Sequence, residues 1–346
     1  MTQHLEVLLQ NLTHLTLDET FSGVYSVTSP KTSIHQSFGY ANRSEQIQHE
    51  VKTRFGIASG CKLFTAIAIC QLVEQGRLCF STSLDSFQTF NLPDISSKVT
   101  IHQLLTHTSG IPDYFDESLS DDFEALWRDV PMYRLQQLRD FLPLFQQKTM
   151  KDEPGSRFSY NNAGYILLGL IVEEVTGQRF ADYIEQSIFQ PANMSDSGYF
   201  SLDALPAKTA LGYIDHSDGS WRTNQYAIPV KGGADGGAYV TVQDMTRFWE
   251  ALFSHQLLDA ASTSLLLTPH VMVNDRGGSY GYGIWIQHHS SGDIYKYHVM
   301  GYDPGVSFHS GYYPETEVIS VVCSNQSDGA FDVMKQIEAQ IRERIE

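Results

Sequence analysis

A serine and a lysine three residues apart, Ser59 and Lys62, are the residues of this chain whose types and spacing first suggest chemistry. They open the stretch SGCKLFTAIAICQLV, which is apolar on nearly every side after the lysine and so predicts a buried helix. Residues at positions i and i+3 share a helix face, so the two side chains are expected to touch. Burial favours the neutral amine, which could take the proton of a serine at the positive end of the helix dipole.

The structural alternative is a lysine whose stem lies along apolar surface while its ammonium group reaches water. A Ser-x-x-Lys match arises by chance about once or twice in a chain of this length. Here the single match coincides with the start of a helix too apolar to tolerate an idle lysine. We therefore favour a nucleophilic Ser59 activated by Lys62.

The elements that must position this pair are strand patterns at both ends of the sequence and helical patterns between them. Residues 21–58 alternate as strands of an antiparallel meander, and further strands after residue 280 precede a final helix from about Gly329. The expected fold is α+β, an α/β sandwich: one antiparallel sheet from both termini, flanked by helices, with a mostly helical lobe inserted. We assign residues 1–79 and 240–346 to the sheet domain and 80–239 to the lobe, with the active site in the cleft between them.

Local signals mark several helix ends. A leucine stripe over residues 5–15 predicts an N-terminal helix. Gly76 and Gly177 are typical of residues at which helices end. Thr241 and Asp244 form a predicted capping box at the start of another helix.

Composition excludes several classes of function. The 346 residues carry a formal net charge of −17 without a Lys/Arg cluster, which argues against nucleic acid and anionic membranes as partners. There is no transmembrane run and no signal peptide, so we expect a cytoplasmic protein unless the chain has been trimmed.

The cysteines and histidines do not indicate a metal or a redox centre. The four cysteines lack C-x-x-C spacing and are expected to be buried thiols, although Cys61, beside the serine, could have a perturbed pKa. His102 and His107 are five residues apart, which does not suit a metal pair on one helix face. We predict no metal and no cofactor. The serine of THTSG, Ser109, is interpreted as structural.

Two other segments are expected to lie near the site. GGADGG lacks the Lys-Ser/Thr ending of a phosphate loop, so we interpret it as a close backbone turn beside the pocket. The acidic stretch DYFDESLSDDFEALWRD predicts a solvated helix that could border the cleft and disfavour anionic substrates.

These residues resemble a known family, the serine β-lactamases and penicillin-binding proteins. The resemblance is closest to the branch with AmpC-type β-lactamases, D-alanyl-D-alanine carboxypeptidases, D-aminopeptidases and esterases. It covers almost the whole chain, through FGIASGCKLFTAIAICQLVEQGRL, LLTHTSGIPDY, EPGSRFSYNNAGYILLGLIVEEVTG, GGADGGAYVTVQDMTRF and GYDPGVSFHSGYYPETEVISVVCSN. It implies a β-lactamase/transpeptidase-like fold and acyl-transfer chemistry at Ser59.

The family's second motif is Tyr-x-Asn, which Tyr160 and Asn162 match. The resemblance implies that Tyr160 lies against Lys62 and shares its proton, and that Asn162 bonds Lys62 and the substrate. Which of Lys62 and Tyr160 is the resting base stays open. The alternative is a turn with an asparagine cap.

The third motif, Lys or His, any residue, then Gly, is irregular here. Counting back from Asp-Pro-Gly makes Gly301 the motif glycine and the N–H of Tyr302 the oxyanion donor, but it puts Val299 at the Lys/His position. Neighbouring residues of a strand face opposite ways. We expect a bulge before Gly301 that brings His298 to the pocket as a substrate-binding residue; without one, a substrate carboxylate loses its handle.

The sequence thus predicts a serine hydrolase acting through an acyl-enzyme on an ester, amide or lactam carbonyl. An esterase or D-amino-acid peptidase is favoured over a true β-lactamase, with small molecules or short peptides as substrates and β-lactams as possible covalent ligands. The alternative is a penicillin- or peptide-binding protein of the same fold that is acylated but turns over poorly. Deacylation depends on the position of a water molecule, so the sequence does not separate the two.

Overall fold

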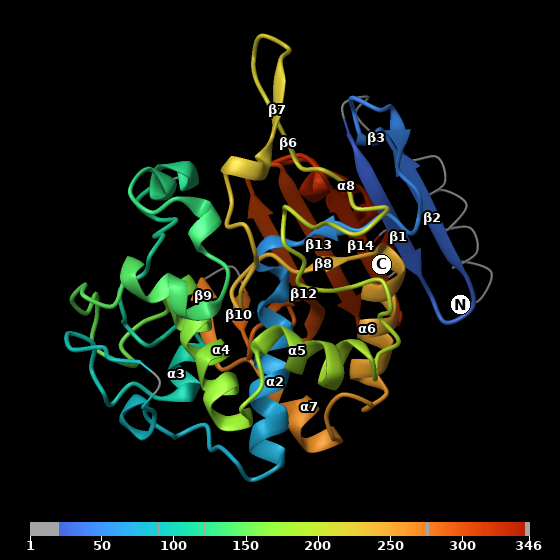
Figure 1. Cartoon of the computed structure of the whole chain (residues 1–346). Helices are drawn as coiled ribbons and strands as arrows, with labels where there is room; N and C mark the ends of the chain where they lie inside the picture. The colour runs from blue at the N-terminus through green and yellow to red at the C-terminus, as the bar shows by residue number, and fades with distance from the viewer. Residues whose placement is uncertain (1–20, 89, 121, 275–276, 343–346) are drawn as a thin grey trace.

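The computed structural model describes residues 21–88, 90–120, 122–274 and 277–342, which are organised around one eight-stranded antiparallel sheet (Figure 1). In sheet order the strands are β2 (Ser33–Phe38), β1 (Gly23–Thr28), β14 (Val318–Ser324), β13 (Val306–Tyr313), β12 (Ile294–Asp303), β11 (Trp285–His288), β10 (Gly278–Tyr280) and β9 (Val271–Asn274). β1 pairs with β14, so segments near both ends of the sequence meet in the sheet, as predicted. The leucine stripe of residues 5–15 lies outside the described residues.

Both faces of the sheet are covered by helices. On one face α8 (Ala330–Arg342) packs against β13 and β14. On the other face α6 (Val242–Phe253) packs against β14 and β1, and the short turn η1 (Ala58–Cys61) lies on β12 and β13. α2 (Lys62–Glu74) follows η1 directly, and its residues from Lys62 to Leu72 are all buried, as its continuous apolar sequence predicts.

Residues between β5 (Phe55–Gly56) and β8 (Tyr239–Val240), which pair with each other, hold α2 and the helices that pack beside it. Figure 1 shows these helices gathered beside the sheet: α3 (Ile101–Leu105), α4 (Asn162–Thr176) and α5 (Phe180–Ile184). The same stretch of chain contains short helical turns: η2 (Leu84–Ser86), η3 (Phe123–Arg128), η4 (Met132–Arg134), η5 (Leu138–Leu144), η6 (Glu185–Phe189) and η7 (Asn224–Tyr226). α7 (Ala260–Leu266) also packs on α2. Two small hairpins complete the fold: β3 (Tyr40–Asn42) with β4 (Ile47–Gln48), and β6 (Tyr213–Asp215) with β7 (Trp221–Thr223).

All three predicted helix ends are confirmed, although the capping box at Thr241 is only half formed. Gly177 caps α4 with φ +71°, and Gly76, with φ +68°, follows the last turn of α2. Thr241 caps α6 by accepting the N–H of Asp244 at 3.0 Å. The reciprocal half of the capping box is wrong, because the Asp244 carboxylate instead accepts hydrogen bonds from Asp196 N–H and the Ser197 hydroxyl.

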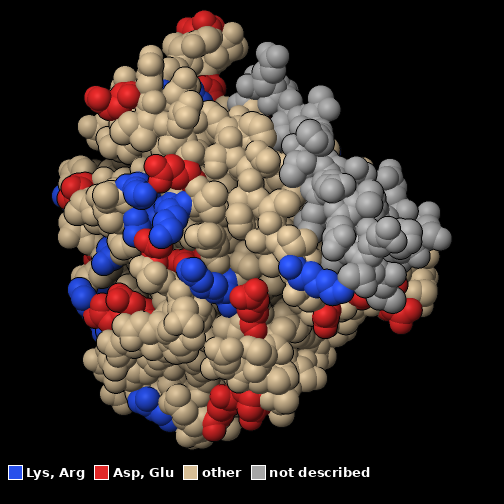
Figure 2. All heavy atoms as spheres, turned by 90° about the vertical axis from the view of Figure 1, so that its right-hand side faces the viewer, with Lys and Arg blue, Asp and Glu red and all other residues tan. Residues whose placement is uncertain are grey.

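The surface charges are interspersed. On the face shown in Figure 2, basic side chains lie beside acidic ones rather than in an uninterrupted basic patch. The described residues form ion pairs that include Arg54–Asp196 and Lys208–Glu50. Within the part of the chain that the structure describes, no helix is both long and apolar enough to cross a membrane.

Candidate active site

Ser59 lies in η1, a tight turn that comes before α2 rather than within its first turn. The residue before it, Ala58, has a backbone φ of +43°, which is unusual for a residue with a side chain and persists only where neighbours hold it. Two main-chain hydrogen bonds to the glycine segment do so: Ile57 N–H to Ala238 O at 3.0 Å, and Gly237 N–H to Ala58 O at 3.3 Å. The serine is therefore presented from a fixed, strained turn.

Lys62 is 2% exposed, and its buried amine is fully engaged. Nζ lies 2.8 Å from Ser59 Oγ, 2.8 Å from Asn162 Oδ1 and 2.6 Å from the main-chain oxygen of Asp235. Three oxygen atoms therefore surround Nζ within hydrogen-bond distance. The contact expected between Ser59 and Lys62 is present.

Tyr160 lies on the loop that leads into α4, and its ring centre is 4.9 Å from Lys62 Nζ. Burial, followed by the negative charge of Glu117, raises the pKa of Tyr160 well above its ordinary value of 10. The phenol is therefore protonated at neutral pH.

Asn162 is the first residue of α4 and is fixed at its backbone by a buried carboxyl group that the sequence analysis did not single out. Asp113 Oδ2 accepts the N–H of Asn162 at 2.8 Å, and its Oδ1 accepts the N–H of Ala163 at 3.0 Å. Both N–H groups are at the N-terminus of α4 and have no partner within the helix, and a carboxylate is favourable at this position. Burial nevertheless raises the pKa of Asp113 to about 7.

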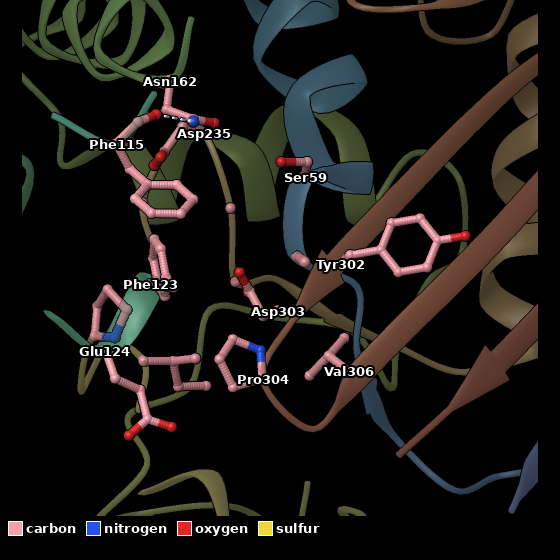
Figure 3. Close-up of a pocket in the computed structure, with 18 of the residues that line it drawn as sticks. Ser59, Phe115, Phe123, Glu124, Asn162, Asp235, Tyr302, Asp303, Pro304 and Val306 are labelled. Atoms are coloured by element: carbon pink, nitrogen blue, oxygen red, sulfur yellow. Dashed lines mark hydrogen bonds between the residues drawn. The ribbon is translucent and has the colours of Figure 1, made fainter. Parts of the chain in front are cut away.

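Gly301 brings β12 directly against the serine turn. A Cβ at this position would lie 2.1 Å from the main-chain oxygen of Ile57 and 2.7 Å from the nitrogen of Ser59, so only glycine fits. The next residue, Tyr302, is part of the pocket wall, but its ring points away from Ser59 (Figure 3). At Ser59, β12 therefore contributes main-chain atoms and no side chain.

The predicted bulge that would bring His298 to the pocket is wrong. β12 pairs with β13 without interruption from Tyr297 to Asp303, so His298 and Gly301 face opposite sides of the sheet. A bulge does exist on β12, near Tyr295, but it precedes His298 and leaves this alternation unchanged. His298 stacks on Trp285, its ring centre 6.5 Å away, and burial holds its pKa well below 6.5. Val299 is in the apolar core.

A cavity of about 510 Å³ opens beside Ser59 (Figure 3). Most of its wall is apolar and aromatic. The charged residues that line it within the described part of the chain are four acidic ones: Glu117, Glu124, Asp235 and Asp303. Three of these have partners: Glu124 is paired with Arg222, Asp235 accepts the phenol of Tyr114, and Glu117 accepts the side-chain N–H of Asn162 at 3.5 Å. Burial and the charge of Asp235 raise the pKa of Asp303 to about 7.

Both segments expected near the site line this cavity. The acidic stretch contributes Glu117 and Glu124, although its helix is only the short turn η3. In the glycine segment, Gly233 N–H donates to Gly236 O at 2.8 Å, which forms the close turn that the sequence indicates. That turn also supplies the main-chain oxygen of Asp235 to Lys62.

The remaining sequence candidates stay outside this arrangement. Burial raises the pKa of the Cys61 thiol to about 12, so this cysteine is not an activated nucleophile. Ser109 is buried in the loop after α3. Among the described residues, no group of three or more His, Cys, Asp or Glu side chains is placed to hold a metal ion.

Comparison with known proteins identifies the family to which this chain belongs. A family model described as Beta-lactamase matches residues 18–342. The chain belongs to the beta-lactamase family. The β-lactamase/transpeptidase-like fold predicted from the sequence is confirmed.

Individual relatives agree with this placement. A penicillin-binding protein from Bacillus halodurans is 58% identical, with a TM-score of 0.90 over 96% of this chain and 99% of that one. Penicillin-binding protein 4* of Bacillus subtilis is 29% identical over 303 residues, which cover 83% of this chain but only 64% of that protein. A D-amino acid amidase from Ochrobactrum anthropi, solved with D-phenylalanine, shares the fold at 20% identity, with a TM-score of 0.78 over 99% of both chains.

Proposed function

We propose that this protein is a serine hydrolase that acts through an acyl-enzyme on ester or amide carbonyls. The observation that carries the proposal is the 2.8 Å contact between Ser59 Oγ and the buried amine of Lys62. Without a catalytic use, a lysine in this apolar helix would be a desolvated charge with little to gain.

Lys62 is the proposed resting base. Its two other partners, the Asn162 side-chain oxygen and the Asp235 main-chain oxygen, can only accept hydrogen bonds. A neutral amine uses its two N–H groups on these oxygens and turns its lone pair to the Ser59 hydroxyl. Because the raised pKa keeps the phenol of Tyr160 protonated, Tyr160 is the proposed general acid.

The proposed acylation has balanced proton transfers. Ser59 Oγ bonds to the substrate carbonyl carbon while its proton passes to Lys62. The bond to the leaving oxygen or nitrogen then breaks as Tyr160 donates its proton, and the Lys62 ammonium restores that proton to the phenolate. Water releases the acyl group by the same route in reverse. The main-chain N–H groups of Ser59 and Tyr302 would stabilise the oxyanion.

The substrate is proposed to be a neutral or cationic ester or amide rather than a penicillin. The cavity wall combines apolar side chains with carboxylates, and Val299 occupies the position where a carboxylate-binding Lys or His is expected. A substrate carboxylate would meet Glu117 and Asp303, and no Lys or Arg is among the described residues that line the cavity. The D-amino acid amidase of the same fold provides a precedent for amide substrates.

Intact-protein mass spectrometry after incubation with a fluorophosphonate and, separately, with a penicillin tests the proposal. We expect a fluorophosphonate adduct that is lost in Ser59→Ala. The matched control is Ser109→Ala, which removes another buried serine and should label like the wild type. The penicillin adduct should form more slowly.

Other outcomes would reject parts of the proposal. Well-folded protein that labels with neither reagent would rule out an acyl-serine mechanism. A fast penicillin adduct that persists for hours would identify a penicillin-binding protein with poor turnover. A fast adduct that decays would identify a β-lactamase.

A further inference from the structure

The loop after α3 contains a histidine with no role in the proposed reaction. His107 is 1% exposed and has a backbone φ of +56°, a left-handed conformation uncommon for residues other than glycine. Such a conformation persists only where the surrounding contacts hold it. Three of the contacts of His107 are made to Tyr160 and to the residues on either side of it.

His107 contacts three consecutive residues of the loop that enters α4. Its main-chain oxygen accepts the N–H of Ser159 at 2.8 Å, and its ring Nδ1 accepts the N–H of Asn161 at 3.1 Å. Between these two bonds, its ring centre lies 4.4 Å from that of Tyr160. The residues before and after Tyr160 are thus bonded to the same histidine that packs on its ring.

The hydrogen bonds also fix the state of the imidazole. Because Nδ1 accepts from Asn161, the single proton of the neutral ring is on Nε2, which donates to the hydroxyl of Tyr280 at 3.2 Å. Burial, followed by the charge of Lys62, holds the pKa of His107 well below 6.5. Only this neutral form can accept on one side of the ring and donate on the other.

The ring of Tyr160 has a second aromatic contact. Trp285 stacks on it with ring centres 6.0 Å apart and 16° between the planes. Tyr280 in turn packs edge-on against Trp285 at 4.9 Å. His107, Tyr280 and Trp285 therefore form a connected set of rings around the phenol of Tyr160.

We propose that His107 is a positioning residue that holds the Tyr160 hydroxyl where it can protonate the leaving group. It acts through Tyr160 and has no contact of its own with Ser59. This inference rests on the proposed function, in which Tyr160 is the general acid. A positioned acid matters most when the leaving group is a poor one, such as an alkoxide.

The test compares two esters of one acyl group, ethyl butyrate and p-nitrophenyl butyrate, because the nitrophenolate departs without a proton. The variant is His107→Asn, since asparagine tolerates a positive φ and keeps an acceptor near Nδ1 while removing the ring. We expect kcat/KM to fall about 10-fold for the ethyl ester and less than 2-fold for the nitrophenyl ester. In a Tyr160→Phe background, His107→Asn should change neither rate by more than about 2-fold.

Two controls separate positioning from general damage. His102→Asn alters another partly buried histidine of the same segment, bonded to Tyr282 at 2.8 Å, and should leave both rates within about 2-fold. If His107→Asn does not fold, Tyr280→Phe removes only the acceptor of its Nε2 proton. That change should slow the ethyl ester alone, by about 2- to 3-fold.

Each remaining outcome decides a different question. Equal losses on both esters, or losses that persist in the Tyr160→Phe background, would overturn the inference and leave His107 a structural residue. Wild-type protein that hydrolyses only the nitrophenyl ester would also overturn it, since Tyr160 would then supply no acid to position. Wild-type protein that hydrolyses neither ester and does not label at Ser59 would instead remove the proposed function.

Discussion

The two sides of Ser59 differ sharply. On the helical side, the amine of Lys62 hydrogen-bonds Ser59 and Asn162 and lies against the ring of Tyr160. On the sheet side, β12 offers a glycine, a main chain and the apolar Val299. Under the proposed function, the groups that make and break bonds lie on the helical side, whereas on β12 the apolar Val299 stands where a side chain that binds a substrate carboxylate was expected. Reactivity and recognition are thus separable here.

The largest expected effect comes from removing the amine on the helical side. Lys62→Met keeps the length and apolar stem of the side chain but eliminates the proposed base, so fluorophosphonate labelling should slow on the order of 10³-fold. The protein should also lose about 1–3 kcal/mol of stability, because two buried oxygens lose their donor. A labelling time course and thermal unfolding measure the two effects.

A matched control is Lys151→Met, which removes a surface lysine paired with Asp116. It should label at the wild-type rate. Equal labelling of wild type and Lys62→Met would mean that the network on the helical side does not activate Ser59.

The sheet side should be nearly as sensitive, but for steric reasons. In Gly301→Ala the new methyl group meets the main chain of Ile57 and the nitrogen of Ser59. We expect labelling to slow about 10²-fold, as for loss of an oxyanion donor, with a stability loss of about 1–3 kcal/mol from overpacking. Gly311→Ala on β13 is the control, since its nearest atom would be 3.3 Å away. Similar behaviour of the two variants would show that β12 does not need its close approach to Ser59.

Asp303, one of the acidic residues that line the cavity, should make the stability of the protein depend on pH. The pKa of Asp303 in the folded protein is about 7, above its ordinary value of 3.8, so folding favours the protonated form. That contribution is complete below about pH 4 and is lost as the pH rises to 7. Asp303→Asn should therefore raise Tm by roughly 2–4 °C at pH 8 and hardly at all at pH 4.

Differential scanning calorimetry at the two pH values checks this prediction. Asp218→Asn, on the turn between β6 and β7, is the control, because hydrogen bonds from Ser220 lower rather than raise the pKa of that carboxyl. It should give no gain at pH 8. A gain for Asp303→Asn that is the same at both pH values would contradict the raised pKa.

The smallest effect is expected at His298. Because its side chain lies on the face of β12 opposite Gly301, His298→Ala should change fluorophosphonate labelling by less than about 2-fold, measured per correctly folded molecule. A labelling rate that falls 10-fold or more would mean that His298 contributes to the site, and the two sides of Ser59 would then not differ as described.

On the helical side, Ser59 and Lys62 could be predicted from their local spacing, whereas Tyr160 and Asn162 were predicted from the resemblance to the family. Ser59 and Lys62 lie within one turn, and a lysine in an apolar helix is conspicuous. Asp113 was missed because it acts 49 residues before Asn162, a separation that carries no spacing signal. His107 was missed because a positive φ and a stacked ring cannot be read from residue type.

The error at His298 has a different origin. Sequence alternation correctly states that His298 and Val299 face opposite ways, but it does not say which of them the neighbouring strands bring to Ser59. The pairing with β13 decides this, and it runs without a shift through Gly301. The pairing of β12 with β13, and not the local sequence pattern, therefore determines which of the two side chains faces Ser59.

The pairing of β1 with β14 has a consequence for how the protein reaches its native state. Gly23 meets Ser324, about 300 positions later, so β1 can join the sheet only after nearly the whole chain has left the ribosome. Contacts of such separation slow folding and leave strand edges exposed in the meantime. In contrast, α2 and α4 can associate much earlier, so the helical half of the candidate site should begin to assemble during synthesis, before β12 exists to complete it.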